Sequence, residues 1–302
     1  MRVTLRKILL CAAGLFMMMN MACAQGLYEQ AVRRSMEFQG LEREYYVYVP
    51  DSLAPQRPLL LMLHGYGGKA LGYRPEMLES ARRHGFAVCI PQGYGEEGKS
   101  KAGWNVGYPE QKEMPTDDVA FVLALTDRVC AEFGLSRGNA FYSGMSNGSD
   151  LAYMIAFQHP SAFRAIASVA GLEMQWVSRT MRPSGPVPFM EVHGTADKTS
   201  SWYGDPFNNG GWGEYLAVPI AVGDIVSANR CEYEQTVQLP LKDEGKPSRQ
   251  VILHRYLGSP DGCEVRLFEV QGGKHSWHLA DLDTTEEILK FFECYLNTVE
   301  DE

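Results

Sequence analysis

The sequence predicts an α/β fold: a mostly parallel central sheet with helices on both faces. Residues 59–63 and 86–90 are continuous apolar runs, which are typical of strands covered on both sides. Segments with helical periodicity alternate with such runs along the chain, as in βαβ units. Because no repeat or long linker interrupts this alternation, we expect a single domain over residues 25–302.

Residues 1–24 have the features of a secretory signal peptide. Basic residues precede a short apolar run over residues 8–19, and a small-residue cleavage site ends at Ala24. The run is too short to span a bilayer, so we expect no membrane insertion. Export to the periplasm or the medium is the expectation. Lipid attachment at Cys23 is the less favoured alternative, because Asn20 stands where a lipobox usually has leucine.

The net charge limits the possible partners. The leader holds three of the 28 basic residues and none of the 37 acidic ones, which leaves 25 against 37 and a net charge of about −12. This balance argues against nucleic acid or an anionic membrane as a partner. A neutral substrate, for example one carried on a polysaccharide, fits better. No cysteine or histidine spacing resembles a zinc site, and we expect neither a metal nor another cofactor.

Five cysteines follow the leader, and export would place them where disulfides persist. The odd number leaves at least one thiol free. Cys231 and Cys263 lie in irregular polar segments, whereas the other three lie in apolar or helical ones. They are the favoured pair, although the spacing alone leaves the connectivity open.

Ser146 stands between Gly144 and Gly148 in a Gly-x-Ser-x-Gly pattern. A short apolar strand precedes it, and we expect a helix from Leu151 onward. This context favours a strained strand-to-helix turn with an exposed hydroxyl over an ordinary glycine-serine turn. Both glycines are expected because a β-carbon would clash with the neighbouring strand or helix.

A serine nucleophile needs a base and an acid that orients the base. In α/β hydrolases the order along the chain is serine, acid, histidine. Asp197 directly follows the apolar strand 188–193. His275 and His278 share the last loop, and the two glycines before His275 favour it. Upstream, the glycine-rich loop 64–68 follows a buried strand and suits an oxyanion hole, with a plain turn as the alternative. All these groups follow strands and are therefore expected at one edge of the sheet.

Two long segments have no regular period. Residues 91–115 contain Trp104, which is placed either over the core or in a cleft. Residues 199–218 interleave aromatic residues with glycines and form either an aromatic mini-core or the wall of an aromatic or sugar-binding cleft. Between the two segments, Thr116 is expected to cap a helix with Asp117 and Asp118 in its first turn.

Six motifs occur in an order that resembles a known family. They are His64-Gly65-Tyr66-Gly67-Gly68, Trp104-Asn105, Asp117-Asp118-Val119, Gly144-Met145-Ser146-Asn147-Gly148, His193-Gly194-Thr195-Ala196-Asp197 and Gly273-Lys274-His275-Ser276-Trp277. The set is similar to the secreted serine esterases of carbohydrate esterase family 1. That family contains feruloyl esterases, acetylxylan esterases and polyhydroxybutyrate depolymerases, and the resemblance implies the α/β-hydrolase fold.

The resemblance also implies residue roles. Ser146 would be the nucleophile, Asp197 the acid and His275 the base, while the backbone N–H groups of Tyr66 and Asn147 would form the oxyanion hole. It further implies a disulfide between Cys231 and Cys263. The chain departs from the family at Ser149, where many members have a third glycine, and at Lys274, where many have glycine; neither change removes a catalytic group.

The substrate expected from the sequence is a feruloyl ester on arabinoxylan, because an aromatic cleft would stack a feruloyl ring or a xylose. The candidate substrate-binding residues are Trp104, Trp202, Tyr203, Trp212 and Trp277. Acetylxylan is the second choice and a polyester the third, and an amide-cleaving peptidase is a further possibility. Outside the enzymes, the alternative is a catalytically silent polysaccharide-binding protein. That alternative predicts a missing acid or base, yet both positions are filled.

Overall fold

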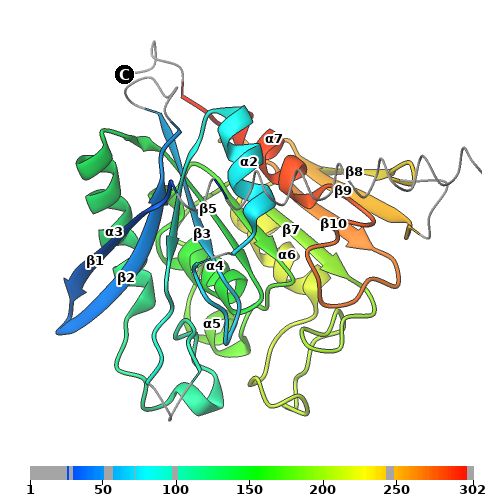
Figure 1. Ribbon diagram of the computed structural model, residues 1–302. Coiled ribbons are helices and arrows are strands. Elements are labelled where there is room, and N and C mark those ends of the chain that lie inside the picture. Colours follow the sequence, from blue (N-terminus) through cyan, green and yellow to red (C-terminus); the bar gives the residue numbers. More distant parts are fainter. Residues whose placement is uncertain are drawn as a thin grey trace, which may run out of the picture.

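The computed structural model describes residues 26, 30–50, 57–71, 73–96, 101–242 and 248–297. The expected signal peptide lies outside these residues. A ten-stranded sheet with the order β1-β2-β4-β3-β5-β6-β7-β10-β9-β8 forms the centre of the molecule (Figure 1). The pairings from β4 through β10 are parallel, and those at the two edges are antiparallel. The predicted mostly parallel α/β sheet is therefore confirmed.

The strands match the apolar runs of the sequence in the middle of the sheet and depart from them at the edges. Their bounds are β1 (Val32–Phe38), β2 (Leu41–Tyr48), β3 (Pro58–Leu63), β4 (Ala87–Pro91), β5 (Ser136–Met145), β6 (Ile166–Val169), β7 (Phe189–Gly194), β8 (Tyr233–Gln238), β9 (Val251–Leu257) and β10 (Val265–Val270). Every residue of β3, β4, β6 and β7 is buried. The sequence did not predict β1 and β8, because their side chains are mostly exposed and show no apolar pattern.

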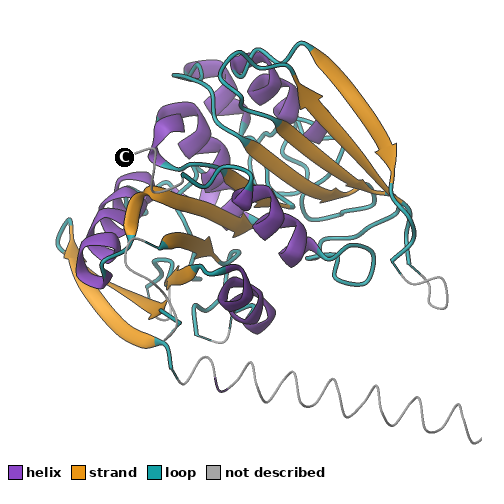
Figure 2. Ribbon diagram, turned by 90° about the horizontal axis from the view of Figure 1, so that it is seen from above, coloured by secondary structure: helices purple, strands orange, loops and turns teal. Residues whose placement is uncertain are grey.

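Helices cover both faces of the sheet (Figures 1 and 2). They are α2 (Pro75–His84), α3 (Asp118–Phe133), α4 (Asn147–Gln158), α5 (Gln175–Thr180), α6 (Val218–Ala228) and α7 (Thr284–Glu293). Leu59, Leu61 and Leu63 of β3 pack in one apolar cluster with α3, α4 and α6. Leu60 and Met62 of the same strand face the other way and pack with α2 and α7.

The start of α3 differs from the expectation. The side chain that caps the helix is Asp117, which accepts a hydrogen bond from Ala120 N at 3.0 Å, and not Thr116. Asp118 is buried, where it accepts hydrogen bonds from Arg43 Nη2 at 2.7 Å and from Thr116 Oγ1 at 2.8 Å. Thr116 therefore orients a buried carboxylate and does not cap the helix.

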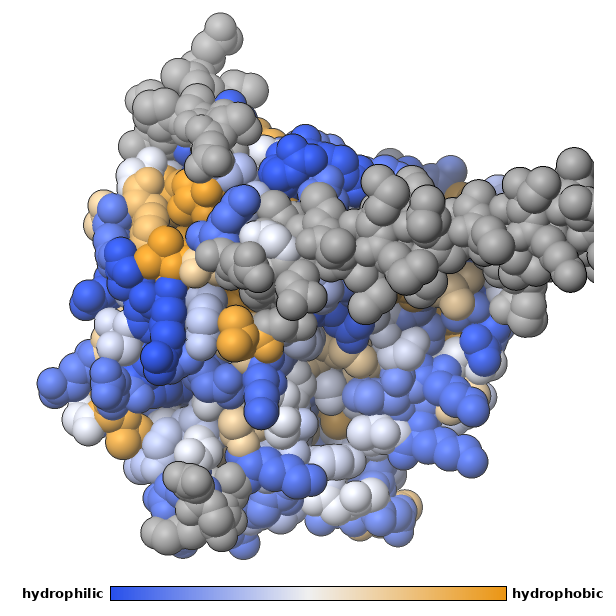
Figure 3. Space-filling model, in the orientation of Figure 1, coloured by the Kyte–Doolittle hydropathy of each residue, from blue (hydrophilic) through white to orange (hydrophobic). Residues whose placement is uncertain are grey.

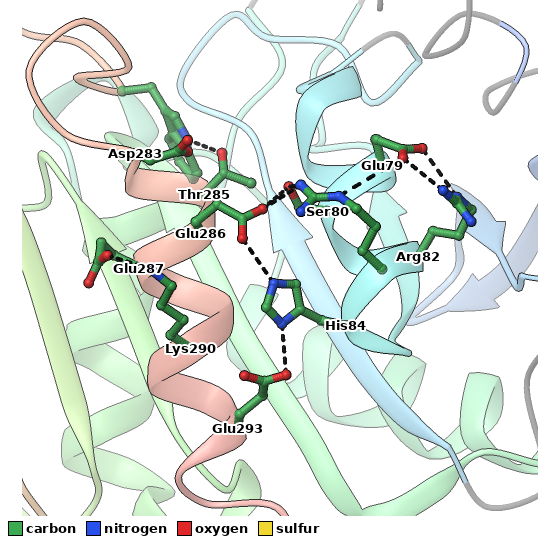
Figure 4. A network of polar contacts seen from close by, with 12 residues as sticks. Glu79, Ser80, Arg82, His84, Asp283, Thr285, Glu286, Glu287, Lys290 and Glu293 are labelled. Atoms are coloured by element: carbon green, nitrogen blue, oxygen red, sulfur yellow. Dashed lines mark hydrogen bonds and ion pairs between the residues drawn. The ribbon is translucent and has the colours of Figure 1, made fainter. Parts of the chain in front are cut away.

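A polar network joins α2 to α7 on the outside of the sheet (Figure 4). His84 Nε2 lies 3.0 Å from Glu286 Oε2, and its Nδ1 lies 2.7 Å from Glu293 Oε1. Arg83 Nη2 and Ser80 Oγ also donate to Glu286, at 2.6 and 2.5 Å. The face shown in Figure 3 is mostly hydrophilic with small separate apolar patches. Within the residues that the structure describes, no helix is long and apolar enough to cross a membrane.

Candidate active site

The turn between β5 and α4 has Ser146 at its apex. Ser146 has φ 55° and ψ −125°, a backbone conformation that is strained for a residue with a side chain. A Cβ on Gly144 would lie 2.3 Å from Gly148 O, and a Cβ on Gly148 would lie 2.8 Å from Leu63 O. The sharp turn, and the need for both glycines, are therefore confirmed. The helix begins at Asn147, four residues before the expected start.

The departure from the family at Ser149 has a clear structural role. Its hydroxyl donates to Gly144 O at 2.6 Å and accepts a hydrogen bond from Val169 N at 2.8 Å. Tyr142 OH donates to Gly148 O at 2.5 Å on the same turn. These bonds tie the first turn of α4 to β5 and β6 and fix the serine-bearing turn.

Asp197 and His275, predicted as acid and base, lie in direct contact. His275 Nδ1 is 2.7 Å from Asp197 Oδ2, and Asp197 Oδ1 accepts hydrogen bonds from Thr199 N at 2.8 Å and Ser200 N at 2.9 Å. A carboxylate can only accept, so Nδ1 of His275 is the donor. Its Nε2 is then the nitrogen left to accept a proton in the pocket.

Sheet topology explains why residues 78 positions apart meet. β7 and β10 are parallel neighbours, so the loops that follow them leave the sheet at the same edge. Ala196 N donates to Gly273 O at 2.8 Å, and a Cβ on Gly194 would lie 2.4 Å from Gly273 C. Glycine at both positions allows the acid and base loops to approach this closely.

The electrostatics favour an ionised Asp197. Burial raises the pKa of this carboxyl, but the hydrogen bond and charge of His275, together with the charge of His193, outweigh burial and lower the pKa below its usual value. Asp197 is thus a carboxylate that lies between two imidazoles. This is the arrangement needed to stabilise a positively charged His275.

The glycine-rich loop after β3 lies against the serine. A Cβ on Gly65 would be 3.2 Å from Ser146 Cβ, so the loop passes directly beside Ser146. His64 Nδ1 donates to Gly65 O at 2.8 Å, and its Nε2 accepts the Gly93 N–H at 3.0 Å. Burial lowers the pKa of His64. This neutral histidine holds the loop and is not a candidate base.

Trp104, one of the predicted substrate-binding residues, has no exposed surface. Its backbone N–H donates to Asn147 Oδ1 at 2.7 Å, Asn147 Nδ2 donates to its carbonyl at 2.9 Å, and its indole N–H donates to His64 O at 2.8 Å. The prediction of a substrate contact at Trp104 is therefore wrong. The residue instead ties the glycine-rich loop to the start of α4.

A pocket of about 220 Å³ opens over the serine. Its lining residues are Tyr66, Lys101, Tyr108, Ser146, Leu172, Thr199, Ser200, Trp212 and His275. Tyr66, Tyr108 and Trp212 form a mutual aromatic cluster with ring centroids 5.3–6.2 Å apart. The pocket thus brings Ser146 and His275 together beside an aromatic wall, and Trp212 is the predicted aromatic residue that lines it.

The remaining predicted aromatic residues lie outside this pocket. Trp277 is buried and donates to Thr285 Oγ1 at 2.9 Å, and Trp202 is largely buried with its ring 6.1 Å from that of His193. Tyr203 is 77% exposed and does not line the pocket. Trp202 and Trp277 therefore serve packing in this structure, which corrects their predicted role as substrate contacts.

A second pocket of about 200 Å³ adjoins the first and shares Tyr66 and Lys101 with it. It is lined by Tyr66, Tyr94, Glu96, Lys101, Glu110, Gln111, Glu113, Met114 and Pro115. The ring of Tyr66 therefore stands between an aromatic pocket and an acidic one. Among the described residues, no group of three or more histidines, cysteines or carboxylates could hold a metal ion.

Asp150 is a site residue that the sequence analysis missed. It is fully buried in α4, where its carboxyl accepts hydrogen bonds from the Tyr108 hydroxyl and, at 2.7 Å, from Leu172 N. Both partners line the serine pocket. Burial raises the pKa of Asp150 to about 8. In the sequence, Asp150 is only a carboxylate in the first turn of an apolar helix, and a favourable interaction with the helix dipole would explain that position equally well.

The predicted disulfide is not formed in the structure. Cys231 and Cys263 are both free thiols: Cys231 Sγ contacts Cys263 O at 3.6 Å, and Cys263 Sγ contacts Asp261 O at 3.6 Å. Each sulfur thus contacts a carbonyl oxygen. The structure therefore does not show the disulfide that the family resemblance implied, although the two cysteines are neighbours.

Comparisons with known proteins agree with this architecture. Residues 43–179 match a family model described as esterase PHB depolymerase. Feruloyl esterase C of Emericella nidulans is 26% identical over 197 residues, which are 62% of this chain and 67% of that protein. The bifunctional acetylxylan esterase/xylanase of Neocallimastix patriciarum is 30% identical over 166 residues, and the match spans 53% of this chain and only 22% of that protein.

Among solved structures, the acetyl xylan esterase from Aspergillus awamori superposes with a TM-score of 0.60 at 14% identity. The superposition covers 87% of this chain and 99% of that one. At this identity the likeness concerns the fold, which is that of the α/β hydrolases. Together with the family match and the named relatives, it identifies the chain as a carboxylic ester hydrolase that resembles the polyhydroxybutyrate depolymerases, feruloyl esterases and acetylxylan esterases.

Proposed function

We propose that the chain is an exported serine esterase that removes feruloyl groups from arabinoxylan through an acyl-enzyme. The observation that supports this most directly is the 2.7 Å contact between His275 and Asp197 at a pocket that also contains Ser146. The three residues also follow one another along the chain as serine, acid and histidine, the order that α/β hydrolases use.

In this mechanism, His275 Nε2 takes the proton of Ser146 as the serine oxygen attacks the ester carbonyl. Asp197 fixes the tautomer of His275 and stabilises the imidazolium that forms. The imidazolium then protonates the leaving alcohol, and the acyl group remains on Ser146. Water repeats the sequence and releases the free acid.

The developing oxyanion is assigned to the backbone N–H groups of Tyr66 and Asn147. Asn147 is the first residue of α4, and the N–H groups in a first helical turn have no acceptor within the helix. The Tyr66 loop is held beside Ser146 by His64 and Trp104. Loss of one such donor typically costs about 10²–10³ in kcat.

The two pockets suggest how an ester would be divided between them. The aromatic pocket offers the rings of Tyr66, Tyr108 and Trp212 for stacking against a feruloyl group. The adjoining pocket offers the carboxylates of Glu96 and Glu110 as acceptors for sugar hydroxyls. We therefore assign the acyl group to the first pocket and the sugar alcohol to the second.

Acetylxylan esterase activity is the second candidate. The serine pocket, at about 220 Å³, is smaller than the roughly 300–1,000 Å³ of most ligand sites, which favours a small acyl group. Polyester hydrolysis ranks third. A catalytically silent polysaccharide-binding protein would use the same surfaces without turnover.

The nucleophile is tested by Ser146→Ala, with Ser178→Ala as the control because Ser178 lies in α5 outside both pockets. We expect Ser146→Ala to abolish both hydrolysis of a nitrophenyl ester and labelling by a fluorophosphonate, while Ser178→Ala behaves like the unsubstituted protein. Retention of most activity in Ser146→Ala would refute the assignment. Binding of xylan without labelling of the unsubstituted protein would indicate the silent binding protein.

The acyl group is tested by comparing methyl ferulate with acetylated xylan. Trp212→Ala should raise KM for methyl ferulate by about twofold to tenfold, because an aromatic pair contributes about 0.5–1.5 kcal/mol to binding. KM for acetyl esters should change little. Tyr203→Ala is the matched control from the same loop, because Tyr203 does not line the pocket. Fast deacetylation with negligible turnover of ferulate would replace the feruloyl proposal with the acetyl one.

A further inference from the structure

A buried histidine lies directly behind the carboxylate of the proposed triad. Neither His193, near the end of β7, nor Glu191 on the same face of that strand has any exposed surface. His193 Nδ1 is 2.9 Å from Glu191 Oε1, and its Nε2 is 2.8 Å from Ser200 O. Nε2 is also 3.7 Å from Asp197 Oδ2, the oxygen bonded to His275. Four side chains thus form a continuous row from Glu191 to His275.

The hydrogen-bond partners of His193 determine its charge. A carbonyl oxygen can only accept, so Nε2 has a hydrogen. Glu191 accepts hydrogen bonds from Gly171 N at 3.2 Å and from Tyr153 OH at 3.3 Å. Both of its oxygens thus act as acceptors, and Nδ1 of His193 is the donor in the contact with Oε1. A ring that donates from both nitrogens is an imidazolium.

The titratable groups around His193 support that charge state. Burial lowers the pKa of His193, but Glu191, Ser200 O and Asp197 together raise it above the ordinary value. The groups that act on this region are Glu191 from β7, Asp197 from the loop after it, Asp150 and Tyr153 from α4, and His275 and His278 from the loop after β10. Burial lowers the pKa of His278, and the charge of His193 contributes in the same direction.

We propose that Glu191 and His193 are a buried ion pair that positions the Asp197 turn and holds the Asp197 carboxylate ionised behind His275. This inference rests on the proposed serine-esterase mechanism. The bond from Nε2 to Ser200 O fixes the same turn whose Thr199 and Ser200 N–H groups donate to Asp197. Both members are positioning residues that act through Asp197, and neither lines the pocket.

The charge of each member depends on the other. A buried charge without a counter-ion is costly, and the hydrogen-bonded carboxylate of Glu191 is the main group that stabilises the charge of His193. With the pair intact, a cation lies 3.7 Å from Asp197 and an anion compensates it on the far side. With only His193 removed, an uncompensated Glu191 would favour protonation of His275, which must be neutral to act as the base.

The experiment measures kcat and KM against pH on a nitrophenyl ester for His193→Gln, Glu191→Gln and the double variant. His84→Gln is the matched control, since His84 also lies between two carboxylates but far from the pocket on α2. We expect each single variant to lose about tenfold to a hundredfold in kcat with little change in KM, as for a misplaced catalytic group. The acid limb of His193→Gln should move to higher pH.

The double variant removes both buried charges together, so it should fold and recover part of the activity lost in either single variant. Recovery of activity, with the shift of the acid limb, supports the ion pair. The proposal would be overturned if the pH profile of His193→Gln superimposed on that of the unsubstituted enzyme, or if the losses in activity were additive in the double variant. Either result would mean that the two residues only pack in the core.

The unsubstituted enzyme offers a test that no folding defect can obscure. Its ¹⁵N spectrum should show one buried histidine whose two ring nitrogens both remain protonated above the ordinary histidine pKa of about 6.5, and His193→Gln should remove that signal. Absence of the signal overturns the proposal even if the esterase is active. Failure of the serine mechanism is seen separately, as activity that survives Ser146→Ala.

Discussion

An imidazole between two carboxylates occurs twice in this molecule, in two very different surroundings. His193 lies between Glu191 and Asp197 in the interior, and all three residues are buried. His84 lies between Glu286 and Glu293 where α2 meets α7, near the surface (Figure 4). The contact distances are similar, from 2.7 to 3.7 Å. Burial is therefore the main difference between the two clusters.

Burial decides what each cluster can do. Near the surface, water and salt screen the charges, so an exposed pair contributes about 0–1 kcal/mol and its loss is tolerated. In the interior, each ion has lost its hydration, and removal of one partner leaves a buried charge without its hydrogen-bonded counter-ion. The outer cluster adjusts stability with pH, whereas the inner one can fix the charge and position of Asp197, the carboxylate that we propose as the catalytic acid.

The largest expected effect comes from removal of one carboxylate in each cluster. Glu191→Gln should lower the free energy of unfolding by about 3–5 kcal/mol, because His193 loses its counter-ion in the interior. Glu286→Gln, the matched change between α2 and α7, should cost less than about 1 kcal/mol. Urea unfolding at neutral pH measures both. Equal losses would show that burial is not what separates the two clusters.

Glu173 shows what a buried carboxyl does without a neighbouring cation of this kind. It has no exposed surface, and its charged neighbour is another carboxyl, Asp224. Burial, reinforced by the charge of Asp224, raises the pKa of Glu173 from 4.5 to about 9. Between those two pH values the unfolded chain releases the proton and the folded chain keeps it. Stability is therefore lost as pH rises through that range.

Glu173→Gln should remove this loss. At a pH near 9 we expect the variant to be more stable than the unsubstituted protein by about 1–3 kcal/mol, the cost of a buried carboxyl that lacks good partners. Thermal unfolding from pH 5 to 9 measures the effect. The control is Glu214→Gln, a surface glutamate paired with Arg179, which should leave the pH dependence unchanged. A steeper loss of stability in Glu173→Gln would contradict the assignment.

The sequence predicted the parts of the site that follow from chain order and strand ends. Ser146, Asp197 and His275 each follow a strand of the parallel part of the sheet, and parallel strands bring such positions to one edge. The sequence did not predict the groups behind them. Glu191 and His193 lie inside an apolar strand. The alternation of side chains along a strand predicts which face of the sheet a side chain occupies, but it does not predict which residues that side chain contacts.

The aromatic residues were predicted least well, for a related reason. A tryptophan in a loop without periodicity has no signal that separates core from cleft, and Trp104 and Trp277 proved to be buried while Trp212 lines the pocket. Their positions depend on hydrogen bonds between distant segments, such as that from Trp104 to Asn147. Edge strands β1 and β8 were missed because exposed strands need no apolar alternation.

The smallest expected effects concern the pH and salt dependence of the α2–α7 cluster. Burial raises the pKa of Glu286, but Ser80, His84 and Arg83 outweigh burial and lower the pKa from 4.5 to about 2. Burial lowers the pKa of His84, but Glu286 and Glu293 raise it above 6.5. Glu286 thus stabilises the fold above pH 4.5 and loses this effect as pH falls toward 2. His84 stabilises it below pH 6.5 and loses this effect as pH rises through its folded pKa.

Glu286→Gln should therefore cost most between about pH 4.5 and 6.5, by less than about 1 kcal/mol, with a smaller cost on either side. At 1 M NaCl, where the Debye length is about 3 Å, that small cost should nearly vanish. The loss caused by Glu191→Gln should persist at the same salt concentration, because ions do not reach a pair with no exposed surface. Urea unfolding of both variants at low and high salt measures this difference between the clusters. If the stability loss caused by Glu191→Gln decreased at high salt, the Glu191–His193 pair would be accessible to solvent.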